Sequence, residues 1–86
     1  MESRYLNFKE VGRTTSGITA IIEVANKSGS VLGEVVWFGQ WRKYCFKTVQ
    51  GIVLDEHCLY DIMKYIVEKT EDHKNSLKNK AQRLFG

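Results

Sequence analysis

Residues 42–66 read RKYCFKTVQGIVLDEHCLYDIMKYI, and the spacing of the apolar side chains changes within them. Residues 42–49 are rich in aromatic and β-branched side chains, which indicates a strand. Further along, apolar residues recur at helical spacing. These residues are Leu59, Ile62, Met63 and Ile66. Asp55 stands before them and is a favourable helix N-cap residue, so the segment predicts a strand followed by a helix that begins near Asp55.

Three more strand-like segments precede this one, at residues 5–11, 18–25 and 31–38. Glycine-containing turns separate them, and connections this short suit an antiparallel meander. In residues 18–25 the side chains predicted to face the core are Ile18, Ala20, Ile22 and Val24. The predicted fold class is α+β: an antiparallel meander of about four strands, followed by a C-terminal helix that packs on one face.

The helical pattern continues far beyond Ile66. A helix from Glu56 to Leu84 would be about 45 Å long at about 1.5 Å per residue, which exceeds the width of four strands about 4.8 Å apart. The last dozen or so residues must therefore turn back near 72–76, or project and meet a partner. We predict one small domain over residues 1–72 and a basic amphipathic helical extension over 73–86.

Charge is arranged in blocks along the 86 residues, whose net charge is +3. Residues 37–54 and 73–86 hold cations and no acid, whereas residues 55–72 hold six acids and two bases. Blocks of cations without acids are where a polyanion such as nucleic acid would bind, although basic residues are also common on solvated faces. The cations of the two blocks are Arg42, Lys43, Lys47, Lys74, Lys78, Lys80 and Arg83.

Residues 37–47 contain five of the ten aromatic residues of the chain, interleaved with cations. Phe38 and Trp41 flank the turn residues Gly39 and Gln40 and are the best candidates for exposed rings. Exposed rings stack on bases and cations contact phosphates, so single-stranded nucleic acid is the favoured ligand. The alternative interpretation is that the aromatic residues of this segment belong to the core. The residues of that alternative are Trp37, Tyr44 and Phe46. The predicted nucleic-acid-binding residues are Phe38, Trp41, Arg42, Lys43, Lys47, Lys74, Lys78, Lys80 and Arg83.

A protein-interaction role stays open beside this hypothesis. In that case the C-terminal helix would dock on a partner. The protein would then be a homodimer, or an inhibitor or adaptor of a host factor. The side chains that would make this contact are Leu77, Ala81, Leu84 and Phe85.

Catalysis and metal binding have weak support in the sequence. Cys45, His57, Cys58 and His73 could donate to a metal, but no C-x-x-C or H-x-x-x-H spacing places two of them on one turn. The nearby acids oppose a thiolate at Cys58. We therefore expect no enzyme, no cofactor and no small-molecule substrate. The two cysteines are expected to be reduced, the chain to have no membrane segment, and its location to be cytoplasmic.

A short pattern in the middle of the chain resembles a family of small uncharacterised proteins encoded by phages and prophages. The pattern consists of Val24-x-Asn26, then Leu32-Gly33-Glu34-x-x-Trp37, then Trp41-Arg42-x-Tyr44-Cys45-Phe46, and then Cys58-Leu59-x-Asp61-Ile62. The resemblance covers residues 23–66, about half of the chain. It implies a setting in a mobile genetic element rather than a mechanism.

Overall fold

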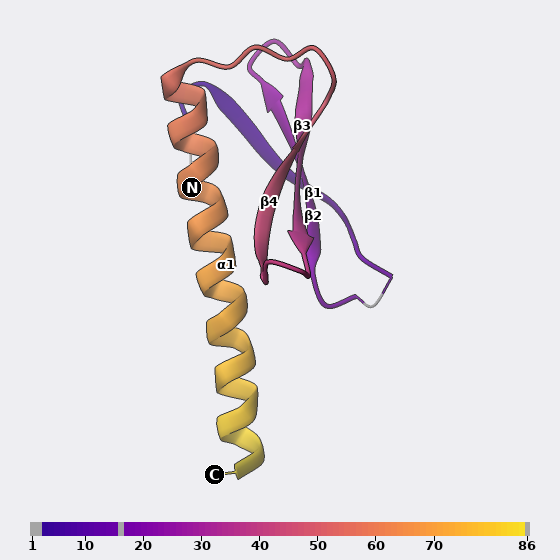
Figure 1. Cartoon of the computed structure of the whole chain (residues 1–86), viewed down its shortest axis with the longest axis vertical. Helices are drawn as coiled ribbons and strands as arrows, with labels where there is room; N and C mark the ends of the chain where they lie inside the picture. The colour runs from indigo at the N-terminus through magenta and orange to yellow at the C-terminus, as the bar shows by residue number, and fades with distance from the viewer. Residues whose placement is uncertain (1–2, 16, 86) are drawn as a thin grey trace.

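The structure is a computed structural model that describes the backbone of residues 3–15 and 17–85, and the side chains as far as residue 77. Its elements are β1 (Leu6–Arg13), β2 (Ala20–Asn26), β3 (Val31–Phe38), β4 (Lys43–Thr48) and α1 (Glu56–Phe85). The four strands pair antiparallel in the order β1-β2-β3-β4, and α1 follows them (Figure 1). The predicted α+β fold, a four-stranded meander followed by a helix, is confirmed.

The inward face of β2 agrees with the sequence except at its first residue. Ala20, Ile22 and Val24 are buried, as their alternation predicts. Ile18 was expected to face the core with them, and that prediction is wrong, since its side chain is 61% exposed. The reason is that β2 begins only at Ala20, so Ile18 lies in the loop after β1, where strand alternation does not apply.

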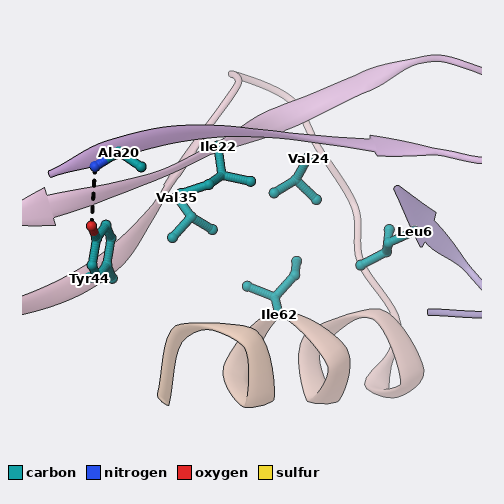
Figure 2. Close-up of a cluster of buried hydrophobic side chains, with 7 residues drawn as sticks. All are labelled: Leu6, Ala20, Ile22, Val24, Val35, Tyr44 and Ile62. Atoms are coloured by element: carbon teal, nitrogen blue, oxygen red, sulfur yellow. Dashed lines mark hydrogen bonds between the residues drawn. The ribbon is translucent and has the colours of Figure 1, made fainter. Parts of the chain in front are cut away.

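The hydrophobic core lies between one face of the sheet and the first half of α1. Figure 2 shows Ile62 of α1 pointing at the sheet face lined by Leu6, Val24 and Val35. Beside this cluster, the rings of Phe8 and Tyr65 stack with centroids 4.3 Å apart. Burying each large apolar side chain stabilises the fold by about 1.5–3 kcal/mol, so this single layer of contacts supplies much of the stability.

The predicted inner stripe of the helix is only half correct. Ile62 is buried and Ile66 is partly buried against the core, as predicted. Leu59 and Met63 were expected beside them, but each is 53% exposed. Part of the apolar surface of α1 therefore faces away from its own sheet.

Tyr44 of β4 contacts β2, β3 and α1 in the core. Its hydroxyl accepts a hydrogen bond from the amide of Ala20 (3.2 Å), and its own amide donates to Thr70 Oγ1 on α1 (3.0 Å). The ring packs edge-on against Trp37, with centroids 5.4 Å apart. Tyr44 is buried, and Trp37 and Phe46 are partly buried against the core, so the core interpretation holds for these three aromatic residues.

The start of α1 is capped as predicted. Asp55 Oδ1 accepts a hydrogen bond from the amide of Cys58 (3.0 Å), and this bond is the main reason that the pKa of Asp55 lies below its ordinary value.

The helix then runs without a break past residue 72, so the chain does not turn back at 72–76, and the second half of α1 extends beyond the end of the sheet (Figure 1). Within the described ranges, no helix combines the length and apolar character needed to cross a membrane.

Candidate nucleic-acid interface

The site begins with the tight turn between β3 and β4. The amide of Trp41 donates to the carbonyl of Phe38 (3.2 Å), and the amide of Arg42 donates to the carbonyl of Gly39 (3.3 Å). Arg42 has a φ of 52°, in the left-handed region that costs an L-residue about 1–2 kcal/mol. The sequence placed Arg42 inside a strand over residues 42–49. That prediction is wrong, because the left-handed residue belongs to the turn and β4 begins at Lys43.

The turn carries two exposed aromatic rings. Phe38 is 38% exposed and Trp41 is 63% exposed, which confirms the exposure predicted for both rings. Their centroids lie 4.6 Å apart, with the ring planes tilted by 60°. The two rings therefore form one aromatic surface at the end of the sheet, on a turn whose conformation two backbone hydrogen bonds hold.

Cations from both acid-free blocks lie beside this turn. The exposed residues Arg42 and Lys43 follow Trp41 directly, and Lys43 pairs in register with Phe38. A groove between β4 and α1 has Lys43 on one wall and Lys74 on the other, and it is completed by Ile66, Val67, Thr70 and Glu71. Lys43 and Lys74, which are 31 positions apart in the sequence, thus line one groove at the same end of the sheet.

The remaining predicted cations on α1 lie further along the helix. The side chains of Lys78, Lys80 and Arg83 lie outside the described residues. The backbone that bears them continues from the end of the sheet that carries the β3–β4 turn (Figure 1). The basic half of α1 therefore projects from the same end of the molecule as the aromatic pair.

Lys47 lies apart from this group. It is about 13 Å from Lys43 along β4, at about 3.3 Å per residue, and it pairs in register with Glu34. Across the sheet, Glu34 pairs with Glu23, and Glu23 pairs with Lys9. Lys47 thus ends a row of two cations and two acids on the face that α1 leaves uncovered, and the structure does not bring it to the turn.

A second groove lies between α1 and the β1–β2 loop, and the sequence analysis assigned it no role. Its lining includes Arg13, Lys69, Asp72 and His73. Arg13 pairs with Glu10 at 3.4 Å, so its charge is partly compensated. His73 packs against Trp37 with ring centroids 4.5 Å apart. Residues 1–36 have no net charge, so no signal in the sequence marked Arg13.

The donor groups considered for metal binding do not gather. In the part of the chain that the structure describes, no three His, Cys, Asp or Glu side chains are placed to hold a metal ion. Burial raises the pKa of the Cys58 thiol, and the hydrogen bond with Asp55 raises it further. A nucleophilic cysteine needs the opposite shift, because the thiolate is the reactive form.

The fold and this surface define a small α+β protein with an exposed aromatic turn beside a basic helix. Over 73 residues the chain is 42% identical to a protein of Acholeplasma phage L2 described as an uncharacterized 9.3 kDa protein. The aligned part covers 84% of this chain and 92% of the phage protein. The chain therefore belongs to the family of this small phage protein, which confirms the predicted kinship with phage proteins. This assignment rests on the alignment as a whole rather than on the motif around Trp37 and Trp41.

No protein-family profile matches the chain, and no solved structure matches it.

Proposed function

We propose that this phage-related protein is a non-enzymatic nucleic-acid-binding protein that takes single strands at the β3–β4 turn. The observation that carries the proposal is the exposed Phe38–Trp41 ring pair beside Arg42 and Lys43. Stacking of one base on an aromatic side chain contributes about 1–3 kcal/mol, and cations beside the ring neutralise the neighbouring phosphates. The turn offers both groups within a few residues.

The exposed rings favour single strands over duplexes. An unpaired base presents its flat face to an aromatic ring, whereas the bases of a duplex are already stacked on one another. The basic half of α1, including Lys74, adds attraction that does not depend on sequence. We therefore expect a preference for single strands and little selectivity among base sequences.

The test is a titration of labelled single-stranded and duplex DNA and RNA oligonucleotides, followed by fluorescence anisotropy of the label. Salt would be set at about 50 and about 200 mM, because phosphate contacts release counterions and weaken as salt rises. The expected result is binding of single strands that is tighter at the lower salt. Absence of binding at the lower salt would overturn the proposal.

Substitution of Trp41 tests the stacking step. Trp41→Ala is expected to weaken single-strand binding by more than about 1 kcal/mol, which is about fivefold. Tyr5→Ala is the matched control, because Tyr5 is also exposed (40%) and stacks on His57 at the start of α1, away from the turn. Equal affinities of Trp41→Ala and the unmodified protein would exclude stacking at this turn.

The role of the lysines in binding phosphate is tested by the salt dependence. The double variant Lys43→Ala/Lys74→Ala is expected to lower the slope of log affinity against log salt by about 0.7 for each phosphate that it no longer neutralises. Lys27→Ala is the control. Lys27 lies in the β2–β3 turn, where its Nζ donates a hydrogen bond to Asn7 Oδ1 of β1 (2.8 Å). A slope that the double variant leaves unchanged would remove these two lysines from the interface.

A further inference from the structure

α1 exposes an apolar stripe that its own sheet does not cover. We call it the outer stripe, and it consists of Leu59, Tyr60, Met63, Val67 and Leu77. Their exposed fractions lie between 48% and 57%. Residues 59, 63 and 67 follow one another at a spacing of four, so they lie along one side of the helix. The stripe borders the groove between α1 and β4, where Val67 is also a lining residue.

The charge of the helix is divided between its two halves. Residues 55–72 hold six acids and two bases, and residues 73–86 hold four bases and no acid. Among the described residues, His57 Nε2 lies 3.4 Å from Glu56 Oε1, while Glu68 and Glu71 form no ion pair. The acidic half is therefore not neutralised within the part of the chain that the structure describes.

We propose that the outer stripe is covered by α1 of a second copy of this chain, running antiparallel, in a two-fold symmetric homodimer. In this arrangement the acidic half of each helix lies along the basic half of the other, and both ends of the interface are attractive. A parallel arrangement would place acid beside acid and base beside base. A pair centred between Asp72 and His73, where the acidic and basic blocks meet, lays residues 60–72 of each helix along residues 73–85 of the other.

The projecting half of α1 is a second reason for this partner. The last part of α1 extends beyond the end of the sheet (Figure 1), and an isolated helix of fewer than about 12–15 residues is marginal in water. An antiparallel partner places the sheet-supported half of its helix beside this projecting half. Each copy thus stabilises the segment of the other that lacks cover.

The first experiment measures the mass of the full chain in solution by light scattering after size-exclusion chromatography. The expected mass is twice the 9.9 kDa of the monomer. Val67→Glu places a charge in the outer stripe and should shift the mass to 9.9 kDa. Val11→Glu is the matched control, because Val11 on β1 is 49% exposed, as Val67 is 48% exposed, yet lies outside the stripe. Circular dichroism would show that both variants are folded.

A charge exchange tests the antiparallel orientation. Glu68→Lys/Glu71→Lys makes residues 55–72 neutral, and Lys74→Glu/Lys78→Glu makes residues 73–86 neutral, so each variant alone loses the attraction. Mixing the two restores one attractive end, where the unchanged basic half meets the unchanged acidic half. The expected result is two monomers that form a heterodimer when mixed.

Two results would overturn the proposal: an unmodified chain of 9.9 kDa at every concentration, which would mean that the stripe serves a different partner, or variants that stay monomeric when mixed. Nucleic acid and the partner helix would compete for the basic half of α1, so these masses are measured without nucleic acid and their outcome does not depend on the binding test.

Discussion

At the scale of single residues, Gly33 shows how closely two strands approach. A Cβ at this position would meet the carbonyl oxygen of Lys47 and would lie 2.9 Å from the Phe46 ring. The carbonyl is part of the backbone of β4 and cannot move aside without disturbing the strand pairing. Gly33→Ala is therefore expected to lower the free energy of unfolding by about 1–3 kcal/mol, measured by urea denaturation.

Gly39→Ala is the control for this prediction. A Cβ at Gly39 has no neighbour within 4 Å, so its unfolding free energy should change by no more than about 0.5 kcal/mol. Equal stabilities of the two variants would show that β3 and β4 are further apart than the structure has them.

Arg42 illustrates what a sequence pattern does not determine at this scale. The glycine at position 39 predicts a turn, and its flanking rings Phe38 and Trp41 are exposed as expected. Alternation along a strand, however, depends on the residue at which the strand begins. The left-handed conformation of Arg42 moves that beginning to Lys43, and no feature of the local sequence favours an arginine in this conformation over glycine or asparagine.

At the scale of elements, the link between β4 and α1 depends on one hydroxyl. Thr70 Oγ1 accepts the hydrogen bond of the buried Tyr44 amide, and β4 is an edge strand of the sheet. Thr70→Val keeps the shape of the side chain but removes the acceptor, which is expected to cost about 1–3 kcal/mol of unfolding free energy. Hydrogen exchange at the Tyr44 amide should become faster in the same variant.

The variant Thr70→Ser tests the contribution of the hydroxyl apart from that of the methyl group. Serine retains the acceptor and loses only one methyl, which corresponds to about 0.8 kcal/mol. Protection of the Tyr44 amide should therefore persist in Thr70→Ser. Faster exchange in both variants would indicate that the hydrogen bond is not what protects this amide.

The elements themselves could be predicted from sequence, while the way they rest on one another could not. Four short β-rich segments with short connections define a meander, because each strand pairs with its neighbour in sequence. The period of residues 59–66 defines a helix and its apolar side. It does not define how much of that side the sheet covers, and for that reason the pattern predicts Leu59 and Met63 in the core although each is 53% exposed. The absence of glycine and proline from residues 56–85 permits one continuous helix but does not require it.

At the scale of the whole molecule, we expect the sheet and the first half of α1 to fold without the projecting half of the helix. The described contacts of α1 with the sheet extend to His73, which packs on Trp37. A chain that ends at His73 is therefore expected to unfold cooperatively, like the complete protein. The same truncation should bind single strands with a shallower salt slope and should have the mass of a monomer. Urea denaturation, anisotropy and light scattering would measure these three properties.

The truncation also distinguishes the two roles assigned to this segment. Loss of cooperative unfolding would mean that residues 74–86 support the domain itself. An unchanged salt slope would remove the basic half of α1 from nucleic-acid binding, and an unchanged mass would remove it from the dimer.

The two basic blocks show which cations could be predicted from the sequence to lie together in the fold. Each block was recognised because it lacks acids, and Lys43 and Lys74 do share a groove. The sequence could not separate Lys47 from them, because its pairing with Glu34 follows from the register of β3 against β4. The register is set by contacts along the whole hairpin. The order of charges along the chain does not determine these contacts.

The order of the elements along the chain has a consequence for synthesis on the ribosome. The sheet ends at Thr48, but residues that cover its apolar face come afterwards, from Leu54 to His73. At about 5–20 residues per second, the stretch from Thr48 to His73 takes about 1–5 s to make. During that interval the face formed by Leu6, Val24 and Val35 has no cover of its own. A chain that stops before Leu54 lacks these covering residues and keeps this face exposed, so we expect such a truncated product to aggregate.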